Sequence, residues 1–315
     1  MKSRTTQRKK APRKKVKYFL AVLLTAIISL AAYTSYQYYG GRQLSMKDQA
    51  ASAKEPVSAE FNGQESPKGK TNVLLLGVDK REKQNGSNSD TMIIAQYDSD
   101  NKLVKMVSLM RDMYVQIPGY EGYKKLNSSY LLGGPELTRQ TIKQNFGIDI
   151  QYYVSVDFKG FERVVDTLAP EGIEVKVEKA MSKNIGVSLE PGIQKLHGKE
   201  LLGYARFRHD AQSDFGRVKR QQEVIKLVSN EILSTSGILK APKLLGTIHP
   251  YIETNISDLK GIGYLKDFLV HRPEITETMS LPVAGSYTNE RVPVFGDVLK
   301  YDETVNSAAI DSFLN

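Results

Sequence analysis

Four arginines within fifteen residues form the group of side chains best suited to chemistry in this sequence. They are Arg206, Arg208, Arg217 and Arg220, with Lys219 beside the last. Guanidinium groups stay charged at ordinary pH, and each offers a rigid fork of donors that fits phosphate or carboxylate oxygens. Their mutual repulsion calls for a compensating anion. The pattern therefore predicts a site for a polyanionic ligand, most simply a pyrophosphate.

The spacing of these arginines indicates how they could converge. Arg206 and Arg208 are two residues apart and share a face only if the chain is extended there. Arg217 and Arg220 are three apart and share a face if a helix has begun, and the helix N-terminus would add positive potential. The alternative is a solvated basic face, partly neutralised by Asp214.

Two carboxylates stand at predicted strand ends. Asp79 follows the apolar run 73–78, and Asp90 opens the next predicted strand. Ligands of α/β sheets bind beyond the carboxyl ends of strands, and Mg²⁺ or Mn²⁺ suits a site of carboxylates, waters and substrate phosphate. The alternative is that both are ordinary polar strand ends, salt-bridged to Arg81.

A third pair, Arg111 and Asp112, follows a predicted strand over 104–109. An arginine followed by an aspartate at a strand end is most often a surface ion pair. By itself this pair therefore indicates little.

The elements that must position these residues alternate between strands and helices. Strands are predicted at 73–78, 91–97, 104–109, 152–156, 173–177, 275–283 and 291–295. Helices are predicted from Pro135 to Gly147 and at 158–168, 198–205, 215–233, 257–270 and 303–314. Such interleaving is typical of an α/β domain with a mixed central sheet. We expect one large domain over residues 72–315.

The N-terminal segment has the features of a membrane anchor. Residues 1–17 hold nine Lys and Arg and no acid, and residues 18–41 carry no charge. A helix of 24 residues spans roughly 36 Å, enough for a hydrocarbon core of about 30 Å. We expect residues 1–17 in the cytoplasm and residues 42–71 as an extracellular stalk. A cleaved signal peptide is the alternative.

Overall composition excludes several classes of partner and of chemistry. The net charge is +9, from 44 basic and 35 acidic residues, but without the nine basic residues of the tail the chain is formally neutral. The excess charge therefore belongs beside anionic membrane lipid, and no nucleic-acid partner is expected. The chain has no cysteine, which excludes disulfides, a thiol nucleophile and cysteine-ligated metals.

Taken in order, these motifs resemble the LytR–CpsA–Psr family. The resemblance rests on Leu74 to Asp79, Ser89-Asp90-Thr91, Arg111-Asp112, Lys125-Leu126-Asn127, Gly198 to Arg208, and Asp214 to Gln222. It covers about residues 72–230 in register, and the residues within the motifs are closest to those of a staphylococcal-type branch of the family. The resemblance implies a three-layer α/β/α sandwich with a mixed central sheet, preceded by one transmembrane helix.

The resemblance also implies an activity. Family members resemble phosphotransferases that move anionic glycopolymers, such as wall teichoic acid or capsule, from an undecaprenyl pyrophosphate carrier to peptidoglycan. The expected partners are therefore a polyprenyl-pyrophosphate-linked polymer, peptidoglycan and membrane lipid. Two alternatives remain: hydrolysis of the polyprenyl pyrophosphate, and a non-enzymatic, membrane-anchored regulator of envelope stress.

Residue roles follow from the same resemblance. It implies that Asp79 and Asp90 bind Mg²⁺, and that Asp90, Arg111 and Asp112 are catalytic, with Asp90 or Asp112 as a candidate base. The implied pyrophosphate ligands are Arg81, Arg111, Arg206, Arg208, Arg217, Arg220 and Gln221.

Overall fold

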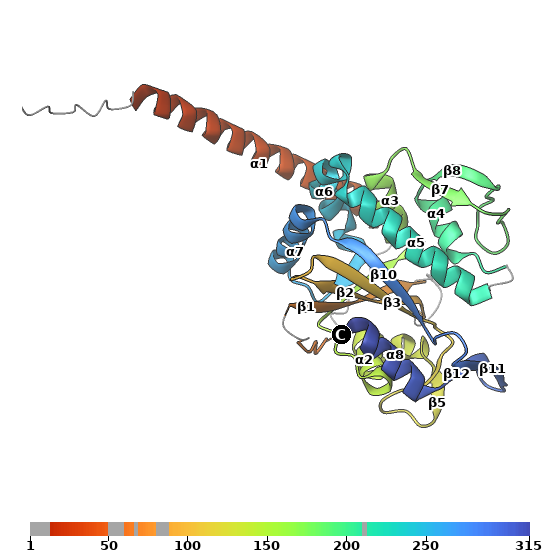
Figure 1. The fold of residues 1–315 in the computed structure, drawn as a ribbon. Coiled ribbons are helices and arrows are strands. Elements are labelled where there is room, and N and C mark those ends of the chain that lie inside the picture. Colours follow the sequence, from red (N-terminus) through yellow and green to blue (C-terminus); the bar gives the residue numbers. More distant parts are fainter. Residues whose placement is uncertain (1–12, 50–59, 66–68, 80–87, 210–212) are drawn as a thin grey trace, which may run out of the picture.

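A computed structural model describes residues 13–49, 60–65, 69–79, 88–209 and 213–315. Arg81 lies outside these ranges, so the predicted role of Arg81 lies outside the described residues. The fold is an α/β domain built on a six-stranded mixed sheet, with helices on both faces (Figure 1).

The central sheet has the order β10-β3-β2-β1-β6-β9. Its strands are β1 (Lys70–Val78), β2 (Ser89–Asp98), β3 (Leu103–Leu109), β6 (Tyr152–Asp157), β9 (Ile252–Thr254) and β10 (Glu274–Leu281). β1 runs parallel to β6, β3 runs parallel to β10, and the other neighbours are antiparallel. The end of β1, the start of β2 and the end of β3 therefore meet at one edge of the sheet.

Three two-stranded ribbons accompany this sheet. They are β4 (Tyr114–Gln116) with β5 (Tyr123–Lys125), β7 (Ile173–Val177) with β8 (Gly192–Leu196), and β11 (Tyr287–Val292) with β12 (Gly296–Tyr301). The predicted strand at 291–295 is wrong, because these residues span the end of β11 and its turn into β12. The apolar pair Val294-Phe295 lies in that turn, and Val294 is 82 % exposed.

Helices form the outer layers. They are α1 (Arg13–Gln49), α2 (Ser128–Phe146), α3 (Phe158–Leu168), α4 (Gly198–Arg206), α5 (Ser213–Leu233), α6 (Thr235–Ile248), α7 (Asp258–His271) and α8 (Glu303–Leu314), with the 3₁₀ turn η1 (His249–Tyr251). α2 and α8 lie on one face of the sheet, and α3, α4, α5 and α6 on the other (Figure 1).

The two faces of β1 are packed differently. Leu74, Leu76 and Val78 are buried, and the first two belong to the core cluster that also contains Ile310 and Leu314 of α8. Leu75 points to the opposite face of the strand and is only half-buried. The layer beneath α3, α4 and α5 is therefore incompletely filled, and a pocket lies there.

Helix α1 contains the uncharged run 18–41 and continues eight residues beyond it. Of the helices within the described part of the chain, none is both long and apolar enough to cross a membrane. The transmembrane segment thus stays a prediction. Phe61, within the predicted stalk, packs on Tyr153 of the domain with ring centroids 4.8 Å apart.

Candidate active site

A pocket of about 730 Å³ lies between the sheet and helices α3, α4 and α5. Its inner wall is apolar, formed by side chains that include Leu75, Val154, Phe161, Leu202 and Ile225. Gly77 forms part of the floor, and a Cβ atom added there would lie 3.0 Å from the Cβ of Thr91. An apolar, elongated ligand group fits such a wall better than a polar one does.

The other end of the pocket is lined by guanidinium groups. Arg206 ends α4, Arg208 lies in the extended link after it, and Arg217 lies in the first turns of α5. The guanidinium carbon of Arg206 lies 4.3 Å from the ring centroid of Phe158, a cation–π contact that fixes its direction. Three of the four clustered arginines therefore converge on one pocket, as the extended link between two helices predicts.

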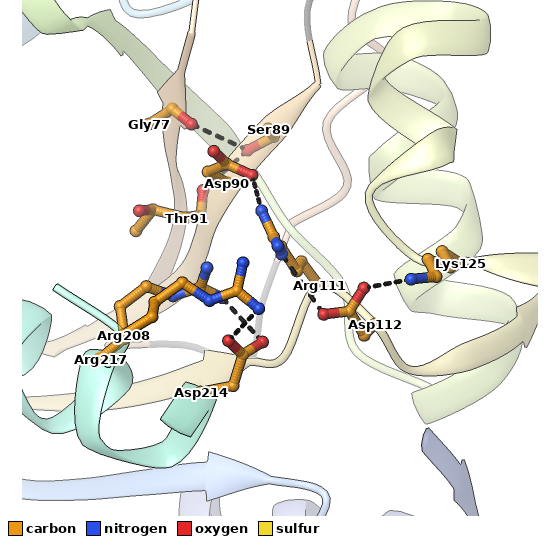
Figure 2. A network of polar contacts seen from close by, with 10 residues as sticks. All are labelled: Gly77, Ser89, Asp90, Thr91, Arg111, Asp112, Lys125, Arg208, Asp214 and Arg217. Atoms are coloured by element: carbon orange, nitrogen blue, oxygen red, sulfur yellow. Dashed lines mark hydrogen bonds and ion pairs between the residues drawn. The ribbon is translucent and has the colours of Figure 1, made fainter. Parts of the chain in front are cut away.

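One carboxylate holds two of these arginines. Asp214 Oδ1 lies 2.5 Å from Arg208 Nη2, and Asp214 Oδ2 accepts a hydrogen bond of 3.1 Å from Arg217 Nη2 (Figure 2). Burial and the neighbouring Arg111 and Arg208 charges lower the pKa of Arg217 to about 10, although Asp214 opposes them. The site therefore contains more buried positive charge than Asp214 alone compensates.

One buried hydrogen-bond donor of Arg217 has no partner among the described residues. Within the described ranges, no acceptor lies within hydrogen-bond distance of its buried Nε atom. A buried donor without a partner costs free energy, about 1–3 kcal/mol, so it indicates a ligand that supplies an acceptor. A phosphate oxygen in the pocket fits this requirement.

Arg111, just after the end of β3, lines the same pocket. Its Nη1 group forms a close ion pair with Asp90 Oδ1, which opens β2 (Figure 2). Burial opposes the Arg111 charge, but Asp90 and Asp112 outweigh burial and raise the pKa of Arg111. Asp90, Arg111 and Arg217 all line the pocket.

Asp112 takes part indirectly. It does not line the pocket. Its Oδ1 accepts a hydrogen bond of 2.7 Å from Lys125 Nζ, and its Oδ2 lies 3.4 Å from Arg111 Nε. Burial raises the pKa of Asp112, but Lys125 and Arg111 outweigh burial and lower it. Asp112 is therefore an ionised carboxylate that orients Arg111, and it is poorly suited to accept a proton.

The two predicted metal ligands lie on neighbouring strands at the same edge. Asp79 follows Val78, which pairs with Ser89, and a β-bulge at this point separates Ser89 from Thr91 and contains Asp90. In Figure 2 the second carboxylate oxygen of Asp90 points away from Arg111.

The donor set at this edge can be tested against a metal ion. No cluster of three His, Cys, Asp or Glu side chains suited to a metal occurs in the described ranges. Two carboxylates without a full protein cage fit Mg²⁺, which keeps several waters and takes substrate phosphate as a ligand.

The two remaining predicted site residues, Gln221 and Arg220, lie in different surroundings. Gln221 is buried and lines the pocket. Arg220 does not line it: Arg220 Nη2 donates a hydrogen bond of 2.5 Å to the carbonyl oxygen of Phe207, and its guanidinium lies over the Phe207 ring. Arg220 thus braces the link between α4 and α5.

Sequence reasoning missed several residues of this site. Lys183, Asn184 and His209 line the pocket, and Asn184 Nδ2 lies 3.1 Å from His209 Nε2. His209 follows Arg208 directly, a position that could have marked it. Nothing in the sequence places Lys183 and Asn184 there, because they lie in the long connection between β7 and β8.

Comparison with known proteins identifies the family. The LytR_cpsA_psr family model matches residues 34–309. The chain belongs to the LytR–CpsA–Psr family. It is 43 % identical over 287 residues to "Regulatory protein MsrR" of Staphylococcus aureus (strain COL), covering 91 % of this chain and 86 % of that relative.

One relative has a name that describes a reaction, and one similar structure contains a bound ligand. "Polyisoprenyl-teichoic acid--peptidoglycan teichoic acid transferase TagU" of Oceanobacillus iheyensis (strain DSM 14371) is 32 % identical, covering 92 % of each chain. A solved structure of TagT bound to LI-WTA is 26 % identical, with a TM-score of 0.62, covering 83 % of this chain and 96 % of that one.

Proposed function

We propose that this protein is a phosphotransferase that moves an anionic glycopolymer of the teichoic acid or capsule type from a polyprenyl pyrophosphate carrier to peptidoglycan. One observation carries the proposal: a single pocket joins an apolar wall to a cluster of guanidinium groups at one end. This division matches a lipid whose chain is apolar and whose head is a diphosphate. The name of TagU supports the reaction class, and the structure of TagT bound to LI-WTA supports a ligand of this kind.

The pocket suggests how the donor binds. The polyprenyl chain lies along Leu75, Val154 and Ile225, and the diphosphate lies against Arg208 and Arg217. Phosphate oxygens take the place that Asp214 fills for these two arginines and satisfy Arg217 Nε. Charge-assisted hydrogen bonds of this kind contribute about 1.5–3 kcal/mol each.

The transfer step is a displacement at phosphorus. A hydroxyl oxygen of a peptidoglycan sugar attacks the phosphorus that carries the polymer and forms a new P–O bond. The bond from that phosphorus to the bridging oxygen breaks, and polyprenyl monophosphate leaves. Arg111 and Arg217 stabilise the charge that moves to the leaving phosphate.

The proton of the attacking hydroxyl needs an acceptor. Of the two candidate bases, Asp90 lines the pocket and Asp112 does not. The pKa of Asp112 is also lowered, with Lys125 and Arg111 outweighing its burial. Asp90 is therefore the better placed of the two candidate bases. A weak base suffices because phosphoryl transfer has a loose transition state.

Asp79 and Asp90 would hold a Mg²⁺ or Mn²⁺ ion. When bound, such an ion neutralises charge on the diphosphate. The pair of carboxylates at one sheet edge supports this assignment.

The location of the protein is part of the same proposal. Helix α1 anchors the protein in the cell membrane through residues 18–41, with residues 1–17 in the cytoplasm and the domain outside. The basic flank and the uncharged run support this topology. The lipid-linked donor and the peptidoglycan acceptor would then both lie on the same side of the membrane as the domain.

A transfer assay with the purified full chain tests the function. It combines a polyprenyl-pyrophosphate-linked polymer, peptidoglycan oligomers and Mg²⁺, and measures polymer–glycan product and polyprenyl monophosphate. We expect both products in equal amounts, and Arg208→Ala should lower both. Cleavage of the donor that is unaffected by glycan would indicate hydrolysis. A regulator without enzymatic activity would leave the donor intact and an Asp90→Asn variant fully functional in a deletion strain.

A further inference from the structure

Helix α1 packs against α6 at backbone distance. A Cβ atom added to Gly41 would come within 2.2 Å of the carbonyl oxygen of Lys243, and one added to Gly246 within 2.1 Å of the carbonyl oxygen of Tyr38. Larger residues would collide with these backbones, so the two glycines permit the contact. Tyr38 and Gly41 also end the predicted membrane span. The domain is therefore seated directly on the end of that span, without a spacer.

Helix α7 has an exposed apolar and basic face. Ile262 is 56 % exposed and Val270 is 65 % exposed, and Lys266 is exposed midway between them. Intervals of four residues place these three side chains on one side of the helix. Lys260 and Tyr264 lie on the other side of the helix, where both contact Tyr152 of the sheet. We call Ile262, Lys266 and Val270 the α7 surface.

Helix α7 lies on the side from which α1 leaves the domain. Figure 1 shows α7 beside α6, at the base of α1. Continuity with α1, together with the Lys266 charge, indicates what covers the α7 surface. Apolar side chains flanking a lysine are typical of protein surfaces that rest in the headgroup layer of an anionic bilayer.

α7 also marks the end of the sheet opposite to the arginines. The Tyr264 ring lies 5.8 Å from the ring of Tyr152, the first residue of β6, and Asp267 accepts a hydrogen bond from Tyr97, near the end of β2. The nine-residue strand β1 begins at this end and finishes beside Asp90. At about 3.3 Å per residue, the two ends are roughly 30 Å apart.

We propose that the α7 surface binds the headgroups of anionic membrane lipids. This inference rests on the proposed membrane anchoring through α1. The contact fixes the domain with α6 and α7 against the bilayer and the arginine end of the pocket facing the cell wall. Along α5, the lining residues change from Arg217 and Gln221 to Val224 and Ile225 as the helix runs toward α6. The apolar end of the pocket therefore lies nearer to the membrane, where a lipid donor originates.

Site-specific labelling of the full chain in lipid vesicles tests the contact. The chain has no cysteine, so one introduced cysteine carries a single environment-sensitive fluorophore. The test positions are Val270→Cys and Ile262→Cys. Val294→Cys, 82 % exposed in the turn after β11, is the matched control, and Val22→Cys, 67 % exposed on α1, reports the anchor itself. Quenching by spin-labelled lipids is measured in phosphatidylcholine vesicles with and without phosphatidylglycerol.

The expected result is strong quenching at Val270 and Ile262, little at Val294, and a further increase with phosphatidylglycerol. Lys266→Gln should lower the ratio of docked to undocked domains roughly fivefold in the anionic vesicles. Quenching at Val270 no stronger than at Val294, with strong quenching at Val22, would overturn the α7 contact and leave the anchor intact. Absence of quenching at Val22 would overturn the anchor and the contact together. Neither result would bear on the transfer assay, which uses detergent-solubilised chain.

Discussion

Arg217 and Asp214, one helical turn apart on α5, form an ion pair in which the arginine side chain is only 4 % exposed. Burial and repulsion by Arg111 and Arg208 lower the pKa of Arg217 to about 10 despite Asp214. An arginine kept in such surroundings, with Nε unsatisfied by the described residues, is prepared for an anion.

Arg208→Ala should lower transfer turnover. Arg208 lines the pocket and its Nη2 lies 2.5 Å from Asp214, so it can exchange that carboxylate for a phosphate. Loss of a charge-assisted contact of about 1.5–3 kcal/mol corresponds to a roughly 10- to 100-fold lower rate. Initial rates of polymer transfer measure the effect. Lys219→Ala, at an exposed position of α5, is the matched control and should retain the wild-type rate.

Ile225→Trp should weaken binding of long-chain donors selectively. Ile225 lines the apolar part of the pocket, and a larger ring there would occupy space needed by the polyprenyl chain. The KM for a long-chain donor should rise, while that for a donor with a very short chain should change little. Asn230→Trp, exposed on the same helix, provides the control. An equal effect on both donors would place the chain elsewhere.

Asp79→Asn should raise the Mg²⁺ concentration that half-maximal transfer requires. The substitution removes one of the two anionic oxygen ligands proposed at this sheet edge, and a neutral amide binds Mg²⁺ less strongly. Titration of activity with Mg²⁺, after removal of metal with a chelator, measures the shift. Asp100→Asn, at the opposite end of β2, is the control. An unchanged Mg²⁺ dependence would remove Asp79 from the metal site.

Asp112→Asn should destabilise the protein at neutral pH and less so in acid. Burial works against the Asp112 charge, but Lys125 and Arg111 prevail and lower its pKa in the folded state. The stabilisation is therefore fully present above the usual Asp pKa of about 3.9, and is lost as pH falls through the lowered folded value. Urea unfolding of wild type and variant across pH measures this difference. A gap that stays constant into acid would contradict the ion-pair assignment.

Asp112→Asn also tests whether Asp112 positions Arg111 or contacts the substrate itself. Asp112 touches Arg111 but not the pocket, so Asp112→Asn should lower kcat while leaving donor KM nearly unchanged. Lys125→Arg keeps a cation opposite Asp112 and should retain more activity than Lys125→Ala. Equal losses in the two Lys125 variants would argue against a chain of contacts from Lys125 through Asp112 to Arg111.

Much of the fold could be predicted from the sequence, for reasons visible in particular residues. The run 73–78 marks a strand buried in the sheet, and Gly147 ends α2 in the left-handed conformation that glycine permits. Short pairings such as β4 with β5 carry no comparable apolar pattern. α6 was missed because Gly237, Pro242 and Gly246 each disfavour a helix, although Ser234 caps one there.

The site was predictable to the extent that neighbouring strands bring their ends together. Asp90 and Arg111 meet, and Asp79 follows the end of the strand beside them, because β1, β2 and β3 are adjacent, a pattern that follows from short connections. The direction of Arg220 was not predictable, because it depends on where the Phe207 carbonyl lies after α4 ends. Lys183 and Asn184 enter through tertiary packing alone.

Ligand binding to the detergent-solubilised full chain tests the central claim most directly. The dissociation constants of a polyprenyl diphosphate, the corresponding monophosphate and the free alcohol, all with the same chain, are compared in Mg²⁺. The account predicts that the diphosphate binds at least about tenfold more tightly than the alcohol, and that Arg217→Met removes this advantage while the alcohol still binds. Equal affinity for all three ligands, or a diphosphate preference unaffected by Arg217→Met, would contradict it.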